Sequence, residues 1–200
     1  MPTQEQKLGT LLAALEEAID ALDREAIPYV LCGGFAVAAR GRPRFTQDVD
    51  LLVKPSEARP ALAALEKAGF QTEETNPHWI FKAFRNGALV DLLFKSKGDV
   101  YLDDEMIARA TLEKVHGVDV RVIPREDLIV IKALVHDEET PRHWWDALSV
   151  VAAGGVDWDY LLRRAVKGPR RVLSLLHYAT SLDLVVPAEA IERLHAGVLR

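Results

Sequence analysis

The sequence predicts a mixed α/β (α+β) fold, in which a mixed β-sheet core with flanking helices is followed by a C-terminal α-helical region. Residues 29–53 join two apolar runs through a Gly-Gly turn, an alanine-rich segment and a basic loop, which is typical of strand, short helix and strand. Asn86-Gly87 separates two further apolar runs and is a strong hairpin signal. Helical periodicity follows the last expected strand, so we expect a core at residues 1–124 and a helical region at residues 125–200.

The chain opens with a helix, because its large apolar residues recur at helical spacing and form one stripe. These residues are Leu8, Leu11, Leu12, Leu15, Ile19 and Leu22. Pro28 separates the helix from the first strand, as expected of a proline at a strand entrance. We expect the helix to pack on the sheet.

The middle of the chain completes the sheet. Pro55 and Ser56 are expected to stop the second strand and cap a crossover helix that Gly69 ends. The later expected elements are strands at 79–84, 88–94, 112–115 and 118–122, and a short helix near residues 106–107.

The remainder reads as helical. The expected elements are helices at 125–136 and 141–153, a helix capped by Asp157, and closing helices at 173–182 and 188–199. Five cations fall between Arg163 and Arg171. They form either a solvated basic face or a surface that grips RNA or an acidic partner.

Two carboxylates interrupt the second strand, which otherwise consists of Val and Leu. Asp48 and Asp50 project from one face with Cα atoms roughly 6.5 Å apart, because side chains alternate along a strand. Like charges this close beside apolar residues are costly unless a cation neutralises them. Mg²⁺ accepts one or two carboxylates together with water and phosphate oxygens. The pair therefore predicts half of a metal site that also holds a nucleotide.

Gly33-Gly34 lies at the end of the first strand, where the short helix begins. Glycine has no side chain to block a ligand, and the following helix directs free N–H groups to this corner, where a phosphate can bind. By itself, a Gly-Gly pair is better explained by a plain tight turn. The nearby Asp-Val-Asp favours the phosphate site.

Asp91 is a lone acid among the apolar residues of the second hairpin strand. A buried carboxylate needs a cation or hydrogen-bond donors, so Asp91 either joins the metal site or forms a structural salt bridge.

The order Gly-Gly, a spacer at residues 35–47 and then Asp-Val-Asp-Leu resembles the signature of the nucleotidyltransferase superfamily, which has the polymerase-beta-like fold. Within it, the segment GGFAVAARGRPRFTQDVDLLV looks most like the small bacterial nucleotidyltransferases. That group includes antibiotic-modifying enzymes, abortive-infection toxins and minimal nucleotidyltransferase antitoxins. The signature covers about a tenth of the chain, and the element order extends the likeness to about residue 123.

The resemblance implies an enzyme that transfers a nucleoside monophosphate from an NTP donor to a hydroxyl acceptor and releases pyrophosphate. Asp48, Asp50 and Asp91 would be its catalytic residues and the ligands of two Mg²⁺ ions, or of Mn²⁺ in their place. The acceptor stays open, with a small molecule or a protein ranked above tRNA, and a toxin or antitoxin is a further expected partner. The alternative is a non-catalytic nucleotide- or partner-binding module, such as an antitoxin. The presence of all three carboxylates argues against that alternative.

Basic residues near the glycine corner are expected to contact the nucleotide. Arg40, Arg42 and Arg44 crowd the loop before Thr46, and guanidinium groups match phosphate oxygens. Arg44 and Thr46 are the favoured contacts, because they are nearest to the Asp strand. Many relatives have histidine where this chain has Arg40, so no role carries over there.

Lys132 is the last expected nucleotide contact. Relatives often place a lysine at this point, followed by an arginine and an aspartate that would map to Arg142 and Asp146. The match is loose, because His143-Trp144-Trp145 replaces the usual polar run.

Composition limits the other possibilities. A chain of 200 residues, 49% of them hydrophobic, can build one sizeable domain or a core with an appendage. The single cysteine, Cys32, excludes an internal disulfide, and the net charge of −5 is unlike that of a protein that coats nucleic acid. We expect a cytoplasmic protein without a membrane span. Zinc, serine-hydrolase and P-loop motifs are not found.

Overall fold

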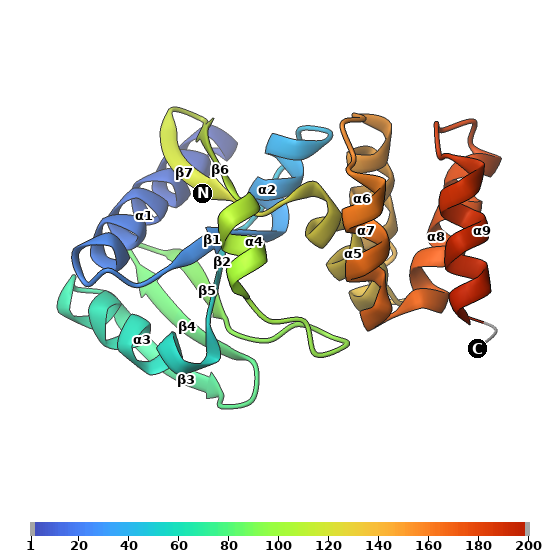
Figure 1. The fold of residues 1–200 in the computed structure, drawn as a ribbon. Helices are drawn as coiled ribbons and strands as arrows, with labels where there is room; N and C mark the ends of the chain where they lie inside the picture. The colour runs from blue at the N-terminus through green and yellow to red at the C-terminus, as the bar shows by residue number, and fades with distance from the viewer. Residues whose placement is uncertain (1–2, 199–200) are drawn as a thin grey trace.

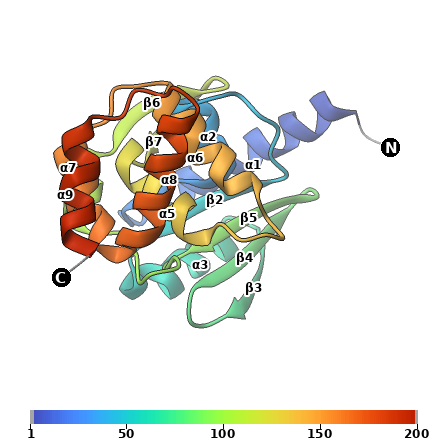
Figure 2. The same ribbon diagram turned by 90° about the vertical axis from the view of Figure 1, so that its right-hand side faces the viewer.

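The structure is a computed structural model, and it describes residues 3–198. Within these residues, seven strands form one mixed sheet in the order β3-β4-β5-β2-β1-β7-β6 (Figures 1 and 2). The strands are β1 (Tyr29–Leu31), β2 (Asp48–Val53), β3 (Gln71–Asn76), β4 (Ile80–Arg85), β5 (Ala88–Leu93), β6 (Thr111–Val115) and β7 (Val118–Val122). β2 pairs antiparallel with β1 and parallel with β5, so the expected mixed sheet is confirmed.

The helices divide into those interleaved with the strands and those that follow them. The first set is α1 (Gln4–Arg24), α2 (Gly33–Arg40), α3 (Ala58–Lys67) and α4 (Asp104–Arg109). The second set is α5 (Arg125–Val135), α6 (Arg142–Ala152), α7 (Trp158–Arg164), α8 (Pro169–Ser181) and α9 (Ala188–Val198). Short 3₁₀ turns, η1 (Pro55–Glu57) and η2 (Ala165–Lys167), precede α3 and α8.

One face of the sheet is covered by α1 and α3. The apolar stripe of α1 is buried against β2, β5 and β7, with Leu15 and Leu22 fully enclosed, and Thr3 closes a capping box at the start of this helix. Helix α3 packs on β3, β4 and β5. The expected packing of the first helix on the sheet is therefore confirmed.

Helix α2 joins the sheet to the helices that follow the strands. Helix α2 contacts β2 and also α5 and α6, so it connects the sheet with the later helices. Figure 1 shows α5 to α9 side by side on the right, with α8 and α9 farthest from the strands. In Figure 2, α5, α6 and α8 lie in front of β2, whereas β3, β4 and β5 extend beyond them. No described helix is both long and apolar enough to cross a membrane.

Several sequence predictions of local structure need correction. Strand β3 was not predicted, because its residues are polar and largely exposed at the edge of the sheet. Ser56 does not cap α3, since it lies inside η1 and the helix starts without a side-chain cap. Trp79 lies in the turn before β4, not in the strand, and is 43% exposed.

The hairpin and the capped helix were predicted correctly. Asn86 and Gly87 both have positive φ and join β4 to β5, as a two-residue turn requires. Asp157 accepts a hydrogen bond from the backbone N–H of Tyr160 and so caps α7. Cys32 is a buried free thiol, as expected from its apolar surroundings.

Candidate active site

Strand β2 presents two acids to the side of the sheet that α1 and α3 leave open. Val49, Leu51 and Val53 point to the covered face and are fully buried, so the alternation of the strand fixes Asp48 and Asp50 on the opposite face. The hydroxyl of Thr46 donates to Asp48 Oδ1 at 2.8 Å and holds that carboxylate. Thr46 therefore supports an acid directly, a contact that the sequence did not indicate.

The third acid comes from the neighbouring strand. In the parallel pairing of β2 and β5, Asp91 stands opposite Asp50. One carboxylate oxygen from each of Asp48, Asp50 and Asp91 lies within 4.8 Å of the other two. The structure thus brings together the three acids that the sequence singled out.

The cluster is electrostatically strained without a cation. Burial, and then the nearby charges of Asp48 and Asp91, raise the pKa of Asp50 to about 6. Burial also raises the pKa of Asp91, against the opposing effect of its hydrogen bond to Lys82. A set of three converging carboxylate oxygens is a fitting donor set for a hard divalent cation such as Mg²⁺. These residues could therefore hold the metal that the resemblance implies.

The glycine corner leaves no space for side chains beside the acids. Gly33 opens α2 with φ of +59°, and a Cβ atom there would lie 1.7 Å from Asp50 Oδ2. A Cβ on Gly34 would lie 2.3 Å from Thr46 Oγ1. The backbone N–H of Gly34 also donates to Asp50 and opposes the rise of its pKa. The first turn of α2 thus directs N–H groups to the acidic cluster, as a phosphate corner needs.

Arg44 and Lys132 converge on one buried acid, Asp146 of α6. Arg44 donates through Nε and Nη2 to the two oxygens of Asp146 at 2.8 and 3.0 Å. Lys132 of α5 lies 3.0 Å from Asp146 Oδ2, and both residues of this pair are about 5% exposed or less. Lys132 also opposes the rise of the Asp50 pKa, so its ammonium group acts on the acidic cluster. The two predicted nucleotide contacts therefore lie together beside the acids, paired with Asp146.

Arg40 has a structural task. Its guanidinium is 6% exposed and donates to the backbone oxygens of Val122 and Ile123 at the end of β7. It also pairs with Glu113 of β6. These bonds fix the end of α2 against the far half of the sheet.

Lys82 is the residue of the site that sequence reasoning missed. It stands opposite Asp91 in the hairpin and donates to Asp91 Oδ1 at 2.7 Å. The signal was available, because a two-residue turn at Asn86-Gly87 pairs 85 with 88 and therefore 82 with 91.

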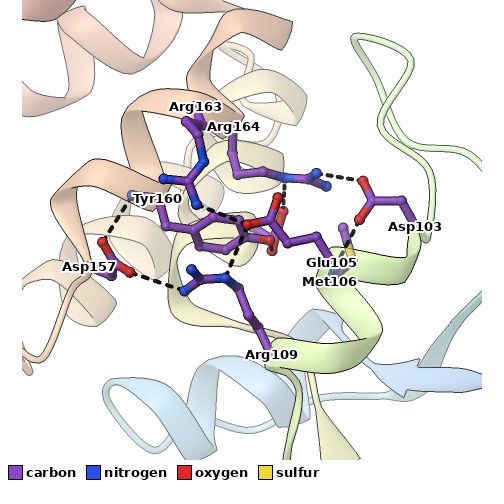
Figure 3. A network of polar contacts seen from close by, with 9 residues as sticks. Asp103, Glu105, Met106, Arg109, Asp157, Tyr160, Arg163 and Arg164 are labelled. Carbon is purple, nitrogen blue, oxygen red and sulfur yellow. Dashed lines mark hydrogen bonds and ion pairs between the residues drawn. The ribbon is translucent and has the colours of Figure 1, made fainter.

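The predicted basic run is not one free surface (Figure 3). Arg164 is paired with the buried Asp127 and with Asp103, and Arg163 is paired with Glu105 at 2.9 Å. Figure 3 shows these arginines around the ring of Tyr160, whose hydroxyl donates to Asp127 at 2.6 Å. The structure therefore uses part of the run to join α4, α5 and α7.

The sequence model of a family described as an uncharacterised nucleotidyltransferase matches residues 3–182. The chain belongs to this family. No sequence among the curated proteins matches that of this nucleotidyltransferase. The family assignment rests on the sequence match alone. The catalytic and metal-binding roles of Asp48, Asp50 and Asp91 are predictions.

Solved structures share the fold of this nucleotidyltransferase at low sequence identity. An antigenic nucleotidyltransferase-like protein from Paracoccidioides brasiliensis is 18% identical over 92% of this chain and 93% of its own, with a TM-score of 0.58. The antibiotic-resistance factor ANT(2'')-Ia is 22% identical over 94% of this chain and 98% of its own, with a TM-score of 0.54. The lincosamide antibiotic adenylyltransferase LnuA, bound to lincomycin, is 14% identical over 70% of this chain and 96% of its own, with a TM-score of 0.50.

Proposed function

We propose that this nucleotidyltransferase moves a nucleoside monophosphate from an NTP to a hydroxyl acceptor and releases pyrophosphate. The observation that carries the proposal is the convergence of Asp48, Asp50 and Asp91 beside the glycine corner. The three carboxylates form a ligand set for divalent cations. At the same place, the corner supplies N–H groups that can donate hydrogen bonds to a phosphate. A site for a metal-bound triphosphate has both properties.

Each acid has a separate task in the proposed site. Asp48 and Asp50 would hold the metal, with Asp48 fixed by Thr46 and Asp50 by the N–H of Gly34. Asp91 would share it and accept the proton of the attacking hydroxyl. Two Mg²⁺ ions, or Mn²⁺, would neutralise phosphate charge and orient the attacking and leaving oxygens.

Arg44 and Lys132 would bind the phosphates of the donor. Both are cations next to the acidic cluster, and both are neutralised by Asp146 in the structure. An incoming triphosphate brings the negative charge that these cations can bind in addition to, or in place of, the carboxylate. Positioning and charge neutralisation would therefore account for most of the catalysis.

A small-molecule or protein acceptor is favoured over tRNA. ANT(2'')-Ia and LnuA, which share the fold, are named for antibiotic resistance and for adenylylation of a lincosamide. The basic run that would favour RNA is partly neutralised, because Arg163 and Arg164 form ion pairs with Asp103, Glu105 and Asp127. A toxin or antitoxin partner stays a prediction.

The test is incubation of the purified protein with labelled ATP, CTP, GTP or UTP, Mg²⁺ and cell extract. We expect label on a small molecule or a protein, and expect Asp91→Asn to lower the turnover at least 100-fold while nucleotide binding is preserved, since general-base catalysis contributes about 10²–10⁴. Nucleotide binding without transfer to any acceptor would contradict the proposal and favour a non-catalytic binding module. Unchanged turnover in Asp91→Asn would leave Asp91 a structural acid.

A further inference from the structure

A cavity lies at the end of β5, the strand that carries Asp91. It has a volume of about 450 Å³, and its lining includes Trp79, Leu93 and Val135. This volume is within the range that accommodates a small organic molecule. Its lining comes from the turn before β4, from the end of β5 and the segment that follows it, and from the last residue of α5. Strands β3 to β5 extend beyond the later helices in Figure 2.

Strand register connects this cavity with the proposed chemistry. Leu93 follows Asp91 by two residues on β5, so both side chains project from the same face with Cα atoms roughly 6.5 Å apart. Lys82 and Ile80 stand opposite Asp91 and Leu93 on β4. On the other wall, Val135 lies three residues after Lys132, on a neighbouring position of the α5 surface. The cavity therefore begins at Leu93, two residues along β5 from Asp91, which is the proposed proton acceptor.

The tryptophan of this cavity is held in an exposed position. The backbone oxygen of Trp79 accepts a hydrogen bond from the N–H of Phe94 at 3.0 Å, which fixes the turn to the end of β5. Its indole is nevertheless 43% exposed. An accessible indole on a fixed turn can stack on a flat apolar group, and Leu93 and Val135 extend the apolar surface.

The charged residues of the lining are cationic. Lys95 and Lys97 line the cavity together with His78 and Ser96, and none of its lining residues is acidic. Lys95 is paired with Asp99, whereas among residues 3–198 no ion pair within 4 Å neutralises Lys97. A polycationic molecule would meet like charges here and would find no carboxylate in the lining.

We propose that this cavity is the acceptor pocket and that its acceptor is a small hydroxylated molecule with a flat apolar part and a neutral or negative charge. The inference rests on the transferase activity proposed above. In the reaction, the acceptor's hydroxyl oxygen forms a bond to the α-phosphorus, and the bond from that phosphorus to the bridging oxygen of the β-phosphate breaks. The electron pair leaves with pyrophosphate, and the hydroxyl proton passes to Asp91.

The experiment separates acceptors by charge. A small-molecule extract is divided by ion exchange into a polycation fraction retained by a cation exchanger and a fraction of neutral and anionic compounds. Each fraction is incubated with the full-length protein, Mg²⁺ and α-labelled NTP. We expect labelled product from the neutral and anionic fraction.

Variants then test the pocket itself. Trp79→Ala and Lys97→Glu should each raise the KM for the acceptor fraction at least about fivefold and leave Mg²⁺–NTP affinity within twofold of the parent. The matched controls are Leu112→Ala and Lys114→Glu on β6, at the opposite edge of the sheet, which should change neither quantity.

The outcomes distinguish the two proposals. Labelled product only in the polycation fraction, or only on protein or RNA, would overturn the acceptor pocket while leaving the transferase activity intact. Product from the neutral and anionic fraction that is insensitive to both pocket variants would also overturn it. Failure to transfer label to any fraction, protein or RNA would remove the proposed function, and the pocket assignment with it.

Discussion

Asp50 concentrates the electrostatic strain of the site in one side chain. It is half-buried beside the glycine corner and faces Asp48 and Asp91, so burial and these like charges raise its pKa to about 6. An amide of the same shape would remove one of three like charges.

We expect Asp50→Asn to abolish nucleotidyl transfer and, without divalent metal, to raise the thermal unfolding midpoint. Asp48→Asn should abolish transfer with little loss of folding. Labelled-NTP assays and thermal unfolding in EDTA measure both effects, with Asp159→Asn on the exposed surface of α7 as the control. Retained transfer in either site variant would contradict the assignment.

We expect His143 to make the stability of the fold depend on pH. Burial, and then the charge of Lys132, lower the pKa of His143 to about 4 from an ordinary value of 6.5, with Arg142 and Arg44 acting in the same direction and Asp146 opposing them. Between these values the unfolded chain binds a proton that the folded protein does not. The free energy of unfolding should therefore fall as the pH falls from 6.5 to 4.

His143→Gln should weaken that dependence. Urea unfolding at pH 7 and pH 5 measures it as the difference between variant and parent, which cancels the contributions of other groups. His195→Gln on the exposed surface of α9 is the control. Equal pH dependence in His143→Gln and the parent would show that His143 does not titrate abnormally.

Individual residues of the site were predictable to different degrees. The spacing of Asp48 and Asp50 fixes a shared face wherever the strand lies. The approach of Asp91 depends on β2 pairing with β5 and not with another strand, and no local pattern states that choice. The position of Lys82 opposite Asp91 was missed, although the turn at Asn86-Gly87 implies it. The pairing of Arg44 with Asp146 joins residues 102 positions apart and could not be predicted from the sequence.

At the scale of elements, α4, α5 and α7 are joined by the polar network around Tyr160. The guanidinium carbon of Arg109 lies 4.0 Å from the centre of the Tyr160 ring, and Arg164 reaches Asp127, which is 1% exposed. Periodicity predicted the helices, but it could not predict which cations of the basic run would form ion pairs in this network. Strand β3 was missed for a related reason, since an exposed edge strand needs no apolar pattern.

We expect Arg164→Met to lower the free energy of unfolding by about 3 kcal/mol, because it leaves the buried Asp127 carboxylate without a cation. Arg163→Met removes an exposed pair with Glu105 and should cost less than about 1 kcal/mol. Urea unfolding of the two variants provides the comparison. Equal losses would mean that the network contributes no more than surface charge pairs do.

At the scale of the whole molecule, the acidic cluster lies where the sheet meets the later helices. Helix α2 contacts both β2 and α6, and Asp146 of α6 bonds to Arg44 from the loop before β2 and to Lys132 of α5. A single apolar cluster includes residues from both sides of this junction. The division into a core at residues 1–124 and a helical region at residues 125–200 therefore stays a prediction. A bound triphosphate would act on the contacts of Asp146 with Arg44 and Lys132 at this junction.

Asp146→Asn tests that junction. It leaves the buried Lys132 without its carboxylate, so the free energy of unfolding should fall by about 3 kcal/mol in the absence of nucleotide. If the donor phosphates bind Lys132 and Arg44, saturating Mg²⁺–ATP should replace the missing negative charge and reduce this deficit. Thermal unfolding and calorimetric ATP binding would then show a larger nucleotide-induced stabilisation and a lower Kd in the variant than in the parent. A deficit unchanged by nucleotide would place the triphosphate away from Lys132 and Arg44, and would restrict Asp146 to holding the later helices against the sheet.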